Sequence, residues 1–242
     1  MPALLMLLFF VALSIGTATV MLILRRARAK RPVETLGSEP LSGSSCVRSS
    51  FMRRPSCWLA IKSRNLLAVQ TALAIDNPKP CPFLRGLSGE EKLFIAPPVK
   101  GWILVTGSGL PEPSEDVDAC FRFLVEVSRK LGQVQLFSYS RVLQHHAWVK
   151  ADGGHVVRAY AWAGRTLWKQ GVRTEAEKEL ELRCFDYLES SQRPLFGQPD
   201  FIAANVDKVP LLAARWSLDP GRIDEHLVET ERGIAGEPSR RY

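Results

Sequence analysis

The chain has 242 residues, of which 24% are charged, and a formal net charge of +7. The charge is uneven, because residues 1–64 contain ten Lys/Arg and two Asp/Glu, whereas residues 65–242 contain 22 and 23. The basic balance therefore belongs to the N-terminal quarter, and it excludes a strongly basic nucleic-acid-binding face on the rest of the chain. We expect no nucleic acid among its partners.

Five scattered cysteines give an odd number with no C-x-x-C pair, which argues against a disulfide framework and against a zinc site. We expect free thiols in a reducing compartment, and no metal or other cofactor. The cysteines are Cys46, Cys57, Cys81, Cys120 and Cys184.

The beginning of the chain carries an uncharged apolar run over residues 3–24. About 20 apolar residues in a helix cross the hydrocarbon core of a bilayer. A cleaved secretory signal peptide is the main alternative, but it needs a basic segment before its apolar core, and only Met1 and Pro2 precede this run. We therefore predict a transmembrane anchor over residues 1–24.

Five basic residues follow the apolar run, namely Arg25, Arg26, Arg28, Lys30 and Arg31. Positive charge flanks the cytoplasmic end of a membrane-spanning helix. This predicts a single-pass protein of the inner (cytoplasmic) membrane with its N-terminus outside and its domain in the cytoplasm; an outward-facing domain is the alternative. Residues 3–31 would bind membrane lipids, with the five cations at anionic headgroups.

Composition divides the remainder into three parts. Residues 25–50 are rich in Arg, Ser, Gly and Pro, which is typical of a flexible linker, here a basic one. Residues 51–230 carry the periodic apolar patterns of one globular domain. Residues 231–242 look unable to pack and are predicted to be a disordered tail.

Apolar runs predict strands over 57–61, 93–96 and 102–106 and from 134 onward. Helical spacing predicts helices over 66–75, 115–131 and 208–217. The last of these begins at Asp207, because Pro210 is tolerated in a first helical turn. Prolines at 78, 80 and 82 predict a loop over 76–83. The strand–helix–strand order of residues 102–138 leaves a parallel crossover and an α+β arrangement both open.

Residues 145–169 predict an antiparallel meander, because two strand-like runs flank Asp152-Gly153-Gly154 and Gly164 permits a second turn. Thr174 and Glu177 then form a capping box, which begins a predicted helix over 175–189. The fold class expected is therefore α+β, with an N-terminal transmembrane helix and one domain whose mainly antiparallel sheet is covered by helices.

Candidate binding residues lie in the meander. Arg158, Tyr160 and Trp162 share one strand face, and His146 and Trp148 can join them from the partner strand. These five residues are called the aromatic strip below. An exposed strip of this kind suits recognition of an anion, a sugar or a protein. The alternative is a sheet face covered by helices, with Arg158 paired to a carboxylate.

The same hairpin contains the candidate metal site. His145, His146 and His155 with Asp152 would form a metal or acid–base site if the register brought them together. Adjacent residues on a strand point to opposite faces, so His145 and His146 cannot easily hold one ion. Surface or partly buried structural histidines are the alternative.

Several pieces between Trp102 and Trp168 resemble uncharacterised bacterial α+β proteins. They are Trp102-Ile103-Leu104-Val105, the proline-bounded 110–113, His146-Ala147-Trp148, Asp152-Gly153, Val157-Arg158-Ala159-Tyr160 and Gly164-x-x-Leu167-Trp168. The hairpin is similar to those of small proteins near polymorphic toxin systems, including immunity-like ones. The resemblance implies a protein-binding role and supplies no catalytic residue.

Two functions follow as expectations. The first is a membrane-anchored cytoplasmic domain that binds a protein partner without catalysis, as an immunity-like protein or an interaction module. The alternative is a metal-dependent hydrolase that uses the His145/His146/His155 hairpin.

Overall fold

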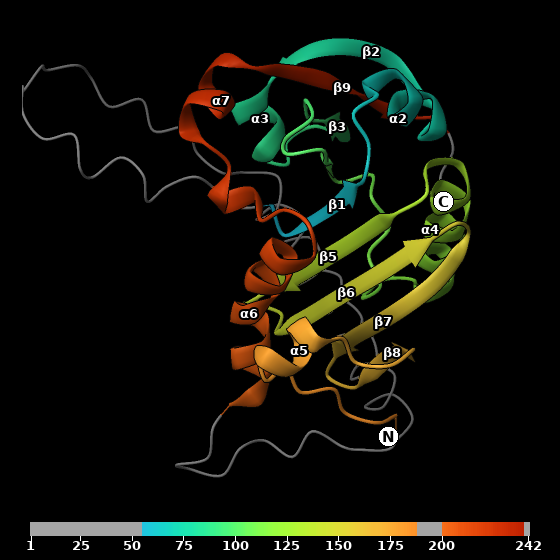
Figure 1. Cartoon of the computed structure of the whole chain (residues 1–242), viewed down its shortest axis with the longest axis vertical. Coiled ribbons are helices and arrows are strands. Elements are labelled where there is room, and N and C mark those ends of the chain that lie inside the picture. Colours follow the sequence, from blue (N-terminus) through green and yellow to red (C-terminus); the bar gives the residue numbers. More distant parts are fainter. Residues whose placement is uncertain (1–54, 188–199, 240–242) are drawn as a thin grey trace, which may run out of the picture. The chain divides into compact units, whose positions relative to one another are not determined.

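The computed structural model describes residues 55–187 and 200–239. Their strands form one nine-stranded antiparallel sheet in the order β2-β9-β3-β4-β1-β5-β6-β7-β8 (Figure 1). The strands are β1 (Cys57–Ile61), β2 (Ile75–Pro82), β3 (Leu93–Ile95), β4 (Ile103–Thr106), β5 (Val134–Ser140), β6 (His145–Asp152), β7 (His155–Ala163), β8 (Thr166–Gln170) and β9 (Arg232–Pro238).

Helices cover both faces of this sheet. In Figure 1, α6 lies to the left of β5 and β6, and α4 lies to their right. The helices are α2 (Leu66–Ala72), α3 (Phe83–Leu87), α4 (Val117–Leu131), α5 (Glu175–Glu179), α6 (Phe201–Trp216) and α7 (Glu225–Thr230), and a 3₁₀ turn, η2, spans Pro220–Arg222. The predicted α+β class with a helix-covered antiparallel sheet is confirmed.

The meander predicted over 145–169 is also confirmed, since β6 pairs with β7 and β7 with β8, both antiparallel. The open question about residues 102–138 has a mixed answer. Strands β4 and β5 both pair antiparallel with β1, which lies between them. They therefore run parallel to each other, and α4 crosses over β1 to connect them.

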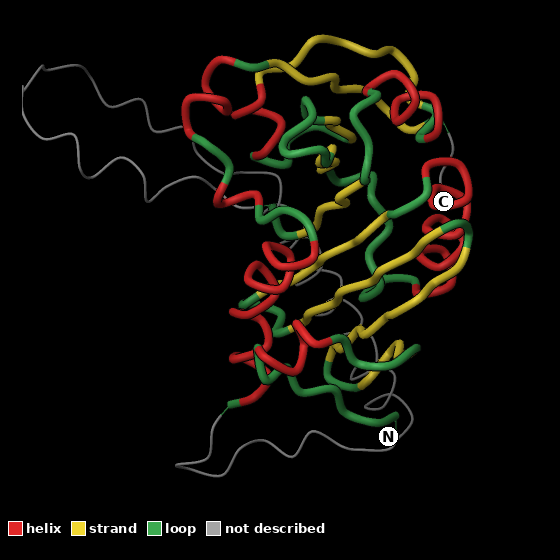
Figure 2. The backbone as a smooth tube through the Cα atoms, viewed as in Figure 1, coloured by secondary structure: helices red, strands yellow, loops and turns green. Residues whose placement is uncertain are grey.

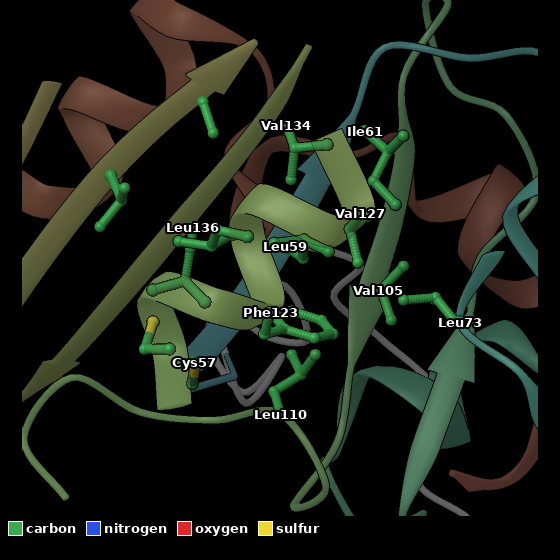
Figure 3. Close-up of a cluster of buried hydrophobic side chains, with 14 of the residues drawn as sticks. Cys57, Leu59, Ile61, Leu73, Val105, Leu110, Phe123, Val127, Val134 and Leu136 are labelled. Atoms are coloured by element: carbon green, nitrogen blue, oxygen red, sulfur yellow. The ribbon is translucent and has the colours of Figure 1, made fainter. Parts of the chain in front are cut away.

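One core lies between the sheet and α4. Side chains of alternate strand residues, including Leu59 and Leu136, pack against Phe123 and Val127 of the helix (Figure 3). The helix begins at Val117, two residues later than predicted, and the carboxylate of its N-cap Asp116 accepts a hydrogen bond from the Ala119 N–H. Strand alternation places the next residues, beginning with Trp58, on the opposite face.

The second core lies under the other helices. It joins Trp58, Phe137 and Trp148 of the sheet to Val209 and Leu212 of α6. Because both faces are covered, most strands read as continuous buried runs instead of alternating ones.

The loop predicted over 76–83 is wrong, because residues 75–82 form β2. This strand lies at the edge of the sheet and pairs with β9 alone, with a register shift between Asp76 and Lys79. An edge strand tolerates proline, since a residue whose N–H would face away from the sheet loses no ladder hydrogen bond. Prolines 78, 80 and 82 therefore mark an edge here and not a loop.

The disordered tail predicted over 231–242 is wrong for residues 232–238, which form β9 between β2 and β3. Figure 2 shows β2 and β9 as two long strands at the top of the view. Gly233 and Gly236 weaken the apolar pattern of this segment, but the neighbouring strands leave no space for a larger residue at either position. A Cβ on Gly233 would lie 2.2 Å from the Ile95 carbonyl oxygen. The globular domain therefore extends past residue 230.

Two helix predictions need correction. Helix α6 begins at residue 201 and not 207, because Asp200 accepts hydrogen bonds from the Ile202 and Ala203 N–H groups and Pro210 is buried inside the helix. The helix predicted over 175–189 ends at Glu179. Glu181 has a φ of 51°. The chain then runs along the sheet, where Tyr160 Oη accepts from the Phe185 N–H.

The predicted anchor (1–24) and linker (25–50) lie outside the described residues. Within residues 55–187 and 200–239, no helix has the length and apolar character needed to cross a bilayer.

A substitution in β9 tests its place in the sheet. We expect Gly233→Ala to lower the free energy of unfolding by about 2 kcal/mol or more, because the new methyl group would overlap the Ile95 carbonyl and the Phe94 ring. Glu237→Ala, at an exposed position of the same strand, serves as the control. Equal stabilities in chemical denaturation would contradict the insertion of β9.

Candidate functional site

The aromatic strip is buried. His146, Trp148, Arg158, Tyr160 and Trp162 are between 0% and 4% exposed. The strip faces the second core, where α5, α6 and the segment that follows α5 cover it. This corrects the prediction of an exposed recognition surface. The alternative holds instead, since Arg158 is paired to a carboxylate beneath a helix.

The partner of Arg158 is Glu177 of α5. Arg158 Nη2 donates to Glu177 Oε1 at 2.7 Å, and Arg158 Nε contacts both carboxylate oxygens at 3.0 and 3.1 Å. Trp148 Nε1 donates to Oε1 at 2.8 Å, and the Thr174 N–H and hydroxyl donate to Oε2. Every group of the pair is thus hydrogen-bonded, as a buried ion pair requires.

The pKa values of the pair follow from this geometry. Burial alone would raise the pKa of Glu177, but the hydrogen bonds from Arg158 and from the Thr174 N–H outweigh it and hold the pKa below its usual range. Burial likewise opposes the charge of Arg158, and the contacts with Glu177 nevertheless raise its pKa. Both groups stay ionised, and together they fix α5 on the sheet.

Removal of the Glu177 charge tests this role. We expect Glu177→Gln to destabilise the fold by about 3 kcal/mol, because Arg158 keeps its buried charge without a counter-ion. Glu175→Gln removes an exposed carboxylate of the same helix and should cost at most about 0.5 kcal/mol. Chemical denaturation measures both. Equal effects would show that the Arg158–Glu177 pair does not hold α5.

His146 lies in the centre of the strip. Its ring stacks on Trp148 and Trp162, with centroids 5.6 and 5.7 Å away. The Nε2 atom lies 3.2 Å from Asn205 Nδ2 of α6, whereas Nδ1 has no partner among the described residues. Burial, with a smaller contribution from His145, lowers the pKa of His146 to about 3. The ring is neutral at physiological pH and acts as a packed aromatic group.

This buried histidine predicts acid sensitivity. Between pH 6.5 and about 3 the unfolded chain binds a proton that folded His146 does not, so stability falls as pH falls. We expect the wild type to lose about 2 kcal/mol more than His146→Phe between pH 6.5 and 5. Denaturation curves at each pH measure the difference in slope. Identical pH dependence in the two proteins would contradict the buried, neutral state.

The histidine hairpin does not form the metal site that was the alternative prediction. His155 pairs with Asp152 beside the turn, whereas His145 pairs with Ala163 at the far end of the same two strands. His145 and His146 face opposite cores, as strand alternation requires. No group of three or more His, Cys, Asp or Glu residues among those described is placed to hold a metal ion.

A polar cluster that the sequence did not suggest lies at the edge of the first core. Ser138 Oγ donates to Glu112 Oε2 at 3.1 Å and lies 3.4 Å from His145 Nε2. That same ring nitrogen is 3.6 Å from Glu112 Oε2. Cys57 is the strand partner of Ser138. The four residues come from three strands and a loop, so no spacing in the sequence could have indicated the cluster.

The cluster is better suited to holding the loop over residues 107–116 than to catalysis. The Ser138 proton is directed at the carboxylate and not at the imidazole. Burial lowers the pKa of His145 and raises the pKa of Cys57, so both groups are neutral. Ser138 is 1% exposed, which leaves its hydroxyl out of reach of a substrate.

The two edges of the sheet differ. Strand β2 carries three prolines, which cannot donate to a neighbouring strand. Strand β8 carries none. Its outward-facing main chain at Lys169 is occupied by a side chain, because Tyr187 Oη accepts from the Lys169 N–H at 2.8 Å and donates to the Lys169 carbonyl at 3.2 Å. One hydroxyl thus fills the place that a neighbouring strand would take.

Exposed apolar side chains gather around β8. Phe121 of α4 contacts Trp168, with ring centroids 6.0 Å apart. Val157 lies beside Gly171. The next residue in the chain, Val172, has 84% of its surface exposed. The exposed side chains of Phe121, Val157, Val172 and Tyr187 are called the apolar border below.

Comparison of the chain with protein-family models, curated proteins and solved structures finds no match.

Proposed function

We propose that the chain is a membrane-tethered domain that binds an extended segment of a partner protein along β8 and performs no catalysis of its own. The observation that carries the proposal is the contrast between the two sheet edges. One carries three prolines, and at the other, among the described residues, the hydroxyl of Tyr187 bonds the outward-facing main chain of Lys169. Addition of a strand to an exposed edge is a common mode of peptide recognition. The tether is the apolar run over residues 3–24 with its five following cations.

The residues around β8 indicate which side chains the partner segment would carry. Arg165 precedes the strand and Arg173 follows it, and neither lies within an ion-pair distance of a carboxylate in the described part of the chain. The apolar border lies between them. The partner would therefore present apolar side chains in an extended conformation with acidic residues at its ends. The resemblance of the hairpin to immunity-like proteins supports the same class of function, because such proteins act by binding.

Photo-crosslinking in cells tests this proposal. A benzophenone amino acid replaces Val172 beside β8 or, as the matched control, Val142 in the β5–β6 turn, which is 92% exposed. We expect a discrete protein adduct from position 172 alone, mapping to an extended segment of the partner. Arg165→Glu should abolish it, because this change repels the acidic end of the segment.

Tyr187→Phe should strengthen binding of the partner, whereas Arg165→Glu should abolish it. It leaves the Lys169 N–H and carbonyl without their present partner, so the edge is open to a strand. We expect affinity for the partner to increase about fivefold, the equivalent of one hydrogen bond. The proposal would be overturned if positions 172 and 142 gave the same adduct. It would also be overturned if neither Arg165→Glu nor Tyr187→Phe changed the yield of the adduct.

A further inference from the structure

A tight turn connects β3 to β4 at one end of the sheet. Val99 and Trp102 exchange two main-chain hydrogen bonds, from the Val99 N–H at 2.8 Å and from the Trp102 N–H at 2.9 Å. The two central residues, Lys100 and Gly101, have φ angles of 51° and 81°. Positive φ at both positions defines a type I′ turn, in which Asn-Gly is the preferred pair.

Lys100 is an unusual choice for this position. A residue with a Cβ pays an energetic cost in the left-handed region, which Asn and Gly reduce or avoid. Strain that the fold retains is a pointer to function. What Lys100 supplies and Asn would not is a positive charge, and other cations lie beside the same turn.

Two of these cations converge on Gly101. A Cβ placed on this glycine would lie 3.8 Å from Arg64 Nε and 3.9 Å from Lys62 Nζ, so both nitrogens are within about 4 Å of one point. Lys62 Nζ also lies 4.7 Å from the centroid of the Trp102 ring, which holds the ammonium group in place. Glycine leaves the space between the two side chains open.

Lys62, Arg64 and Lys100 are called the cationic corner below. All three are exposed, and none has a carboxylate within ion-pair distance among residues 55–187 and 200–239. The charges of Lys62 and Arg64, which lie near one point, repel each other, and an anion between them would offset that repulsion. The N–H groups of Lys100 and Gly101 donate no hydrogen bond within the described parts of the chain, so both are available to donate to an anion.

We propose that the cationic corner binds a phosphate group, carried either by a membrane lipid or by a small soluble molecule. Arg64 offers the planar guanidinium that matches phosphate geometry, and Lys62 offers a point charge oriented by Trp102. The corner is separate from β8, so its ligand does not compete with the partner segment. A lipid phosphate bound here would hold the domain against the membrane independently of the N-terminal run.

The test uses the full chain labelled with 5-fluorotryptophan, in nanodiscs of phosphatidylcholine. The fluorine resonance of Trp102, assigned by Trp102→Phe, reports on the corner. We titrate inorganic phosphate in one arm, and in the other we replace part of the phosphatidylcholine with phosphatidic acid. A saturable shift with inorganic phosphate indicates a soluble ligand, and a shift with phosphatidic acid alone indicates a lipid. Either result supports the site.

Charge-matched variants decide whether the corner itself binds. Lys62→Gln/Arg64→Gln should weaken binding about tenfold or more, since each cation near a phosphate is worth roughly fivefold. Lys79→Gln/Lys92→Gln removes two charges from the groove between β2, β9 and β3 and should leave binding unchanged. No shift in either arm, or equal weakening by both double variants, would overturn the proposal.

Lys100→Asn separates function from folding. This change restores the preferred Asn-Gly pair, so we expect the thermal unfolding midpoint to rise while phosphate binding weakens about fivefold. A merely structural turn would gain stability and leave the Trp102 titration unaltered, and that result would also overturn the assignment of Lys100.

Discussion

The buried ion pair of Arg158 and Glu177 determines how the second face of the sheet is used. Two charges without solvent are costly. Hydrogen bonds within the pair, from Trp148 and Thr174 to Glu177, and from Arg158 to the Ala159 and Gln170 carbonyls offset that cost. These contacts place α5 over β6 and β7. The chain after α5 is held in turn by Tyr160, which brings Tyr187 to the edge strand.

Much of the fold follows from local pattern. Short apolar runs located β1, β3 and β4, and the glycines of two turns located the β6–β8 meander, because strand alternation and turn chemistry act over a few residues. Strands β2 and β9 could not be located in this way. Their prolines and glycines are acceptable only because of where the two strands pair, and that pairing joins residues 150 or more positions apart.

The candidate site shows the same division. The sequence placed the five strip residues on one face correctly, but period-two alternation is identical for a face in water and a face under a helix. The residue that pairs with Arg158 beneath the helix does have a signal in the sequence. Glu177 completes the predicted capping box with its carboxylate, and the two oxygens of that carboxylate also bind Arg158. The cluster of Glu112, Ser138 and His145 had no such local signal, since three separate segments build it.

Coverage of both sheet faces restricts where this domain can recognise anything. Most side chains of the central strands belong to one core or the other, so large aromatic residues such as Trp148 are not available to a ligand. The main chain at the β8 edge and the turns at the strand ends lie outside both cores. The edge at β8 offers hydrogen bonds along an extended chain, which suit a peptide, and the turn at Gly101 offers converging cations, which suit an anion.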